Sequence, residues 1–86
     1  MFEFELDSGN ISKLRIVRIM RGIDLDEILS VFDDSESLIY PAKDDLPGEE
    51  RFMIVGLSNR KRLISVIFTV RHNKIRPFQC VANKRK

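Results

Sequence analysis

Residues 48–76 read GEERFMIVGLSNRKRLISVIFTVRHNKIR, and this stretch decides the fold. It holds two runs rich in β-branched and aromatic residues, 51–57 and 63–70, on either side of a short polar loop. That pattern is typical of a β-hairpin. A third such run, 74–81, follows after a His-Asn pair. Three consecutive antiparallel strands are about the smallest sheet that is stable in water, so the stretch predicts the centre of an antiparallel sheet.

The alternation of side chains predicts which face of this sheet is buried, because successive residues of a strand point to opposite faces. We expect one uninterrupted apolar row of the second run to face the core: Ile64, Val66, Phe68 and Val70. The first run is apolar on both of its rows, so its register stays open. Either Glu50 or Arg51 should therefore lie beside Thr69 on the open face.

The N-terminal third predicts a strand and a helix. Residues 2–6 alternate between apolar and acidic side chains, which indicates a half-buried strand. Residues 11–21 follow a turn-rich segment and end at Gly22, a residue favoured just beyond a helix. Their isoleucine and valine content would also suit a strand, and the helix is the favoured interpretation. On this helix we expect an apolar flank formed by Ile16, Val17, Ile19 and Met20.

A second helix and an edge strand precede the hairpin. Asp24 and Glu27 have the spacing of a capping box, in which each side chain bonds the backbone of the other residue. Apolar residues then recur at helical spacing as far as Phe32. Residues 37–42 predict a short strand, and Pro41 confines it to an edge or a strand end. The chain is thus expected to be α+β, with an antiparallel sheet packed by two N-terminal helices.

Length and composition indicate one small soluble domain. The chain has 86 residues, of which 43% are hydrophobic and 33% charged. Its single cysteine cannot form an internal disulfide and suits a reducing compartment. No apolar run approaches the roughly 20 residues that span a bilayer, and the N-terminus does not resemble a signal peptide. We therefore expect a cytoplasmic protein that does not associate with membranes.

Charge is distributed very unevenly along the chain. Residues 51–86 contain ten lysines and arginines and no aspartate or glutamate, whereas residues 22–50 contain ten acidic residues and one lysine. A segment without carboxylates creates a positive field that attracts polyanions such as nucleic acids. The alternative is that the acidic and basic segments pair with each other in the fold. Nucleic-acid binding is the favoured interpretation.

Neither a metal site nor a cofactor site is predicted. One histidine and one cysteine cannot build a zinc site of the usual ligands, and there is no glycine-rich phosphate loop. His72 falls in an expected turn, where exposure is the simpler interpretation. Cys80 alternates with Phe78 on an apolar row and is interpreted as a small core residue rather than a nucleophile.

The ordered motifs of the chain resemble those of one family. They include GEERF at residues 48–52, the strand end Gly-Leu-Ser at 56–58, and Lys-Ile-Arg at 74–76. The opening FEFELD and the tail Ala-Asn-Lys at 82–84 fit the same pattern. Together they resemble the BrnT family of toxins from type II toxin–antitoxin systems.

This resemblance implies a compact RelE-like fold and metal-independent RNA cleavage that inhibits translation and growth. It also implies neutralisation by a BrnA-type antitoxin that carries a ribbon-helix-helix DNA-binding part. Metal-free cleavage uses the neighbouring 2′-hydroxyl as the nucleophile, and it needs a base and cations that stabilise the charge growing on the phosphate.

The candidate residues follow from these requirements. Glu50 is the expected base, because it is the carboxylate closest in sequence to the basic sheet. The expected phosphate stabilisers are Arg51, Arg71 and Arg76, since guanidinium groups match phosphate oxygens. The candidates for binding the RNA backbone are Lys13, Arg62, Lys74 and Lys84.

Three features of the family pattern differ in this chain. The family has Lys-His-Gly where residues 20–22 are Met-Arg-Gly, and Ser-Ala-Arg where residues 79–81 are Gln-Cys-Val. The family's C-terminal helix has no counterpart here, so residues 1–86 are expected to form a single domain in which this helix is truncated or absent. The differences leave a second hypothesis open, a degenerate module that binds antitoxin or nucleic acid without cleaving.

Overall fold

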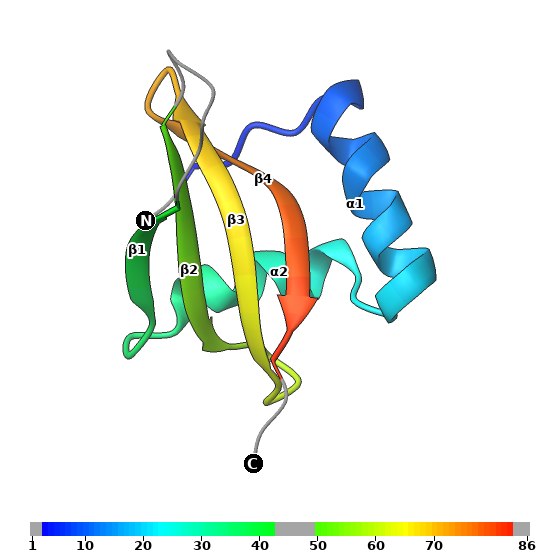
Figure 1. The fold of residues 1–86 in the computed structure, drawn as a ribbon, viewed down its shortest axis with the longest axis vertical. Helices are drawn as coiled ribbons and strands as arrows, with labels where there is room; N and C mark the ends of the chain where they lie inside the picture. Colours follow the sequence, from blue (N-terminus) through cyan, green and yellow to red (C-terminus); the bar gives the residue numbers. More distant parts are fainter. Residues whose placement is uncertain (1–2, 43–49, 84–86) are drawn as a thin grey trace.

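The computed structural model describes residues 3–42 and 50–83, and it shows an α+β architecture, as predicted (Figure 1). The elements in chain order are helix α1 (Ser8–Arg21), helix α2 (Leu25–Ser30), the 3-10 turn η1 (Val31–Asp33), and strands β1 (Leu38–Ala42), β2 (Arg51–Leu57), β3 (Leu63–Arg71) and β4 (Lys74–Ala82). Within the described residues no helix is long and apolar enough to span a membrane.

The four strands form one antiparallel sheet in the order β1-β2-β3-β4, with β2 and β3 at its centre. The register pairs Arg51 with Thr69, which resolves the ambiguity of the first predicted strand in favour of Arg51. Between β3 and β4 the register shifts by one residue: Ile67 pairs with Gln79 and Phe68 with Pro77. Phe78 is therefore the extra residue of a β-bulge, which changes the direction of its side chain.

Helix α1 is capped at both ends by groups that its sequence supplies. The Asp7 carboxylate accepts hydrogen bonds from the backbone N–H groups of Gly9 and Asn10, at 3.0 and 3.2 Å. The Asn10 side chain accepts in return from the Asp7 N–H at 2.8 Å, which completes a capping box. At the other end Gly22 has φ of 70°, a conformation that favours glycine. The helix thus begins three residues before the predicted start.

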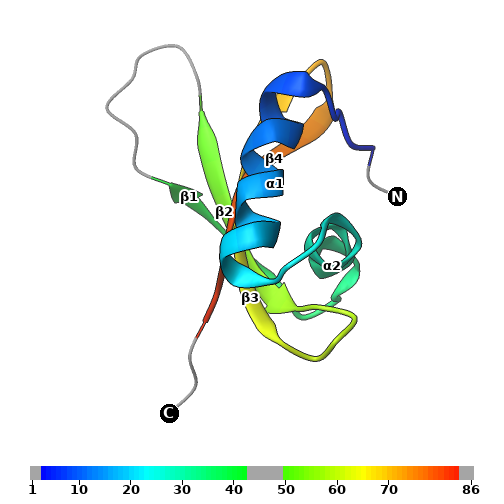
Figure 2. The ribbon, with the colours of Figure 1, turned by 90° about the vertical axis from the view of Figure 1, so that its right-hand side faces the viewer.

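The apolar flank predicted for α1 is wrong except at Val17. Helix α1 runs alongside β4 (Figures 1 and 2), and it faces the core through Leu14 and Val17. Leu14 and Val17 are three residues apart and share one side of the helix. Ile16, Ile19 and Met20 lie on other sides and are exposed.

The core lies between the sheet and α2 with η1. Ile28, Val31 and Phe32 pack against buried strand residues that include Ile54 and Val66. The Phe32 ring meets two other rings edge to face, those of Phe4 at 5.2 Å and Phe68 at 5.3 Å between centroids. Of the predicted core row on β3, Ile64, Val66 and Phe68 are buried. Val70 is 51% exposed, because β3 extends at that end beyond the layer formed by α2 and η1.

Of the strand predicted at residues 2–6, the described residues 3–6 form one bridge. Phe4 lies beside Ile75 in parallel orientation. The Glu5 N–H donates to the Ile75 carbonyl and the Ile75 N–H donates to the Glu3 carbonyl, each at 2.9 Å. This contact attaches the N-terminal segment to the edge of β4. It brings the carboxylates of Glu5 and Asp7 close to Arg76 on that strand.

Candidate functional site

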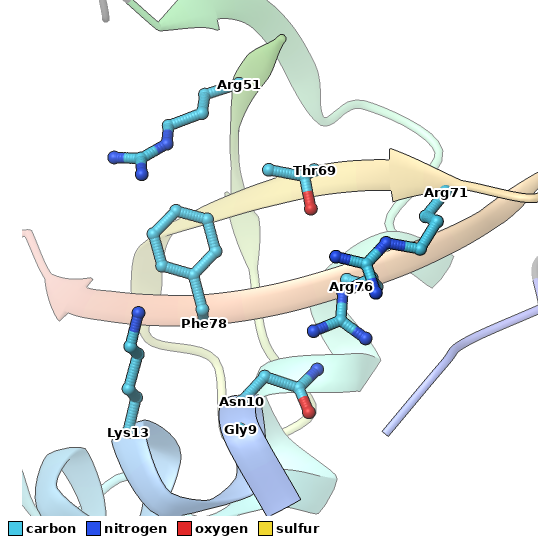
Figure 3. A pocket seen from close by; sticks show the side chains of 8 residues that line it. All are labelled: Gly9, Asn10, Lys13, Arg51, Thr69, Arg71, Arg76 and Phe78. Atoms are coloured by element: carbon cyan, nitrogen blue, oxygen red, sulfur yellow. The ribbon is translucent and has the colours of Figure 1, made fainter. Parts of the chain in front are cut away.

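A pocket of about 250 Å³ opens on the sheet near the turn that joins β3 to β4 (Figure 3). Its lining residues come from α1, β2, β3 and β4, and they are Gly9, Asn10, Lys13, Arg51, Thr69, Arg71, Arg76 and Phe78. Residues that lie far apart in the sequence therefore share one cavity. Four of the eight carry a positive charge at neutral pH.

Strand register explains how three of the polar residues come together. Arg51, Thr69 and Arg76 are direct partners across β2, β3 and β4, so their side chains lie on one face of the sheet. Arg71 follows Thr69 by two residues on β3 and shares this face. Thr69 itself is buried between its neighbours. Three of the four residues predicted to be catalytic thus line one pocket.

Phe78 contributes the aromatic ring of the pocket. The Lys13 Nζ lies 5.4 Å from the ring centroid, and the Arg51 Cζ lies 5.0 Å from it. Both distances fit cation–π contacts. Sequence reasoning placed Phe78 on one row with Cys80, and this is wrong because the bulge separates them: Cys80 is fully buried, whereas Phe78 is half-buried at the pocket. The sequence signal for this bulge was Pro77, because proline within a strand is found at edges and bulges.

Arg76 is held by two carboxylates of the N-terminal segment. Its Nη1 donates to Glu5 Oε1 at 3.0 Å and to Asp7 Oδ2 at 2.6 Å, and its side chain is only 13% exposed. The hydrogen bond from Arg76 lowers the pKa of Asp7 to about 2, and the N–H of Asn10 contributes. The carboxylates fix the guanidinium in place and offset part of its charge.

Asn10 attaches the start of α1 to the bulged strand. Its side-chain amide is buried and donates to the carbonyl oxygens of Glu5 at 2.9 Å and Pro77 at 3.2 Å. Because α1 also carries Lys13, this attachment determines where the Lys13 ammonium group lies. Asn10 was not among the predicted site residues, since a polar residue in a helix cap has no distinctive sequence signal.

Two further predicted site residues, Glu50 and Lys74, lie near this end of the sheet but do not line the pocket. Glu50 directly precedes β2 and is exposed. Lys74 is exposed and lies opposite Arg71 at the turn between β3 and β4. Lys84 lies outside the described residues. The predicted base therefore neighbours the pocket through Arg51 without contributing to its wall.

Arg62 lies at the opposite end of β3 and belongs to the fold. Its Nε donates to Glu27 Oε2 at 2.7 Å, its Nη2 contacts Glu27 Oε1, and the same Nη2 donates to the Gly22 carbonyl at 3.2 Å. Ser58 Oγ also donates to Glu27 Oε2, at 2.7 Å. Glu27 is fully buried, and the hydrogen bond from Arg62 lowers its pKa. Arg62 was predicted to bind RNA, but its guanidinium is already engaged.

The same cluster corrects the predicted capping box of α2. Asp24 does accept from the Glu27 N–H at 3.1 Å. The Glu27 side chain does not bond back to Asp24; it turns into the protein toward Arg62 and Ser58. A charged guanidinium forms stronger hydrogen bonds with a carboxylate than a neutral backbone N–H does.

No group of three or more His, Cys, Asp or Glu side chains that could hold a metal ion is found among residues 3–42 and 50–83. Cys80 is fully buried, and burial raises the pKa of its thiol to about 12. Such a thiol stays protonated at neutral pH and is a poor nucleophile.

Comparison with known families identifies the class of protein. A family model described as the ribonuclease toxin BrnT of type II toxin–antitoxin systems matches residues 10–80. The match extends from the start of α1 into β4 and includes every pocket residue except Gly9. The chain belongs to this family of ribonuclease toxins. A comparison with curated proteins returns no match.

Proposed function

We propose that the chain cleaves RNA without a metal ion at the pocket of Arg51, Arg71, Arg76 and Lys13, and that it thereby inhibits translation and growth. We further propose that its antitoxin is of the BrnA type, with a ribbon-helix-helix part. The observation that carries the proposal is the convergence of four cationic side chains from four elements on one cavity beside an aromatic ring.

The pocket suits a single-stranded RNA backbone. Guanidinium groups form paired hydrogen bonds with phosphate oxygens, and Arg71 is exposed and lies on the same strand face as Thr69. Single-stranded RNA is commonly recognised by stacking of its bases on aromatic side chains. Phe78 supplies such a ring within reach of the same cations.

Cleavage would proceed by attack of the 2′-hydroxyl oxygen on the adjacent phosphorus, which breaks the bond from phosphorus to the 5′-oxygen and forms a 2′,3′-cyclic phosphate. The leaving 5′-oxygen would take its proton from water. Negative charge grows on the phosphate in the transition state, and Arg51 and Arg71 would stabilise it there. Glu50 would accept the 2′-hydroxyl proton from its place beside Arg51. Arg76, held by Glu5 and Asp7, would keep the pocket wall in position.

A second candidate function is binding of RNA or antitoxin without cleavage. One observation favours it: among the described residues that line the pocket there is neither a carboxylate nor an imidazole to transfer a proton. Cations alone bind a phosphate, whereas cleavage also needs a group that accepts a proton.

The test is cleavage of an end-labelled single-stranded RNA by the full chain in excess chelator. We expect cleavage to persist and to leave a 2′,3′-cyclic phosphate. Arg71→Ala should reduce the rate about 10²–10³-fold, because it removes charge stabilisation of the transition state. The matched control is Arg60→Ala, because the Arg60 side chain is 61% exposed in the hairpin at the other end of β3. This variant should leave the rate unchanged.

Each contrary result has a defined meaning. Loss of activity in chelator would contradict metal-independent cleavage. If the parent chain binds RNA without cleaving it, and Arg71→Ala weakens that binding, the second candidate function is correct.

A further inference from the structure

Helix α1 exposes an apolar stripe that the fold leaves uncovered. Ile16, Ile19 and Met20 are 60%, 80% and 75% exposed, respectively. They stand at positions i, i+3 and i+4, so their side chains are neighbours on the helix surface. Isolated exposed apolar residues are common in soluble proteins, whereas a contiguous group on one helix marks an interaction surface.

The stripe adjoins a groove between α1 and β4. Lys13, Ile16, Val17, Phe78 and Gln79 line this groove, which has a volume of about 310 Å³. Ile16 belongs to both the stripe and the groove, so the two form one surface. We call this surface the α1 groove.

The charges around the α1 groove indicate what binds there. Helix α1 carries Lys13, Arg15, Arg18 and Arg21, and it contains no aspartate or glutamate. A second copy of the chain that docked by two-fold symmetry would bring these cations against their own counterparts. An acidic partner would neutralise them instead.

The shape of the surface distinguishes a protein partner from a lipid bilayer. A basic helix with an apolar face can lie in a membrane interface. Here α1 already packs on β4 through Leu14 and Val17, and the apolar residues that remain lead into a groove. An amphipathic helix can fill such a groove with its residues at i, i+3, i+4 and i+7. A flat lipid surface cannot reach into it.

We propose that the α1 groove binds an amphipathic helix of the antitoxin, with apolar residues on the stripe and carboxylates toward Lys13 and Arg15. The identity of the partner rests on the proposed function, whereas the location and chemistry of the surface do not. Lys13 and Phe78 line both the groove and the cationic pocket. The bound helix therefore covers one side of the pocket, and a carboxylate on Lys13 competes with an RNA phosphate.

The experiment measures binding of the full chain to the protein encoded by the adjacent reading frame, by titration calorimetry. Ile19→Asp should weaken the complex at least about 30-fold, as expected when a central apolar contact is lost. Arg15→Glu should also weaken the complex, and the affinity of this variant should depend less on salt than that of the parent chain. Neither residue lines the cationic pocket, so RNA binding by the free variants should be unchanged.

The matched control is Ile39→Asp on β1, where the parent isoleucine is 54% exposed on the edge strand far from β4. It should leave the complex intact. Equal loss with Ile19→Asp and Ile39→Asp, or no loss with Ile19→Asp, would overturn the proposal. The proposal would also be overturned if the parent chain, when saturated with its antitoxin, bound RNA as tightly as the free chain does.

Two further measurements test the other occupants. Concentration-dependent dimerisation of the parent chain in sedimentation, abolished by Ile19→Asp, would assign the surface to a second copy and overturn the proposal. Binding to phosphatidylcholine–phosphatidylglycerol vesicles, abolished by the same variant, would assign it to a membrane. A chain that cleaves no RNA but binds its antitoxin through Ile19 would refute the ribonuclease while supporting the groove.

Discussion

The two ends of strand β3 use arginine in opposite ways. At the end near Leu63, Arg62 is bonded to Glu27, whose carboxylate is fully buried. At the other end, Arg71 is exposed and lines a pocket with Arg51 and Lys13. Both residues are arginines at the ends of one strand, so the difference comes from what surrounds each guanidinium.

Burial of the partner carboxylate decides the role. An ionised carboxylate without a partner is very costly in the interior, so Glu27 retains Arg62 in place. Glu5 and Asp7 are partly exposed and can be hydrated, and they hold Arg76 less tightly. One end thus holds a guanidinium that compensates a buried carboxylate, and the other end presents the exposed Arg71 at a cationic pocket.

Arg62→Ala should have the largest effect on folding. Among the described residues it leaves the buried Glu27 carboxylate with Ser58 as its side-chain partner, and an uncompensated buried charge costs about 3–5 kcal/mol. The free energy of unfolding, measured in urea, should fall by an amount in this range. RNA binding by the folded fraction should remain, because Arg62 does not line the pocket.

Arg60→Ala is the internal reference for this prediction. Arg60 lies in the same hairpin and pairs with Asp24 at 3.3 Å, but the side chains are 61% and 39% exposed. Exposed pairs contribute little, so this variant should unfold close to the parent. Equal destabilisation by the two variants would show that burial of the carboxylate is not the deciding factor.

Acid should weaken both ends of the sheet. The pKa values of Asp7 and Glu27 are below their ordinary values of 3.8 and 4.5, and that of Asp7 is about 2. A lowered pKa contributes stability above the ordinary value and loses it as pH falls toward the folded one. The melting temperature should therefore be steady from neutral pH to about pH 5 and fall below it.

The variant Asp7→Asn separates the two ends in this experiment. This variant should lose the decrease in melting temperature between about pH 4 and pH 2 that is due to Asp7. The decrease that is due to Glu27 should remain. A melting temperature that rises as the parent chain is acidified would contradict the assignment of both pairs.

The smallest effect concerns the restraint on Arg76. Asp7→Asn keeps the helix cap, because asparagine caps as well as aspartate, but it removes a negative charge beside the pocket. RNA affinity should rise about two- to fivefold, with a slightly steeper salt dependence. The measurement is fluorescence anisotropy with labelled RNA over a salt series. Unchanged or weaker binding would show that Asp7 does not compete with phosphate for Arg76.

The sequence by itself determined most of the secondary structure and the polarity of the site. Strands 51–57 and 63–70, the adjacent third strand and the α+β class follow from local patterns of β-branched residues and turns. The absence of carboxylates after Glu50 predicted a cationic surface, and Arg51 and Arg71 are part of it. Local patterns suffice here because they depend on neighbours only a few residues away.

Tertiary structure decided which charges are free and which apolar residues are covered. A one-residue bulge moved Phe78 into the pocket, and Glu27, 35 residues away in sequence, engaged Arg62. Packing of α1 through Leu14 and Val17 left Ile19 in solvent, against the predicted flank. Each outcome depends on contacts between distant segments, and such contacts form only when the register and the packing of helix on sheet are set.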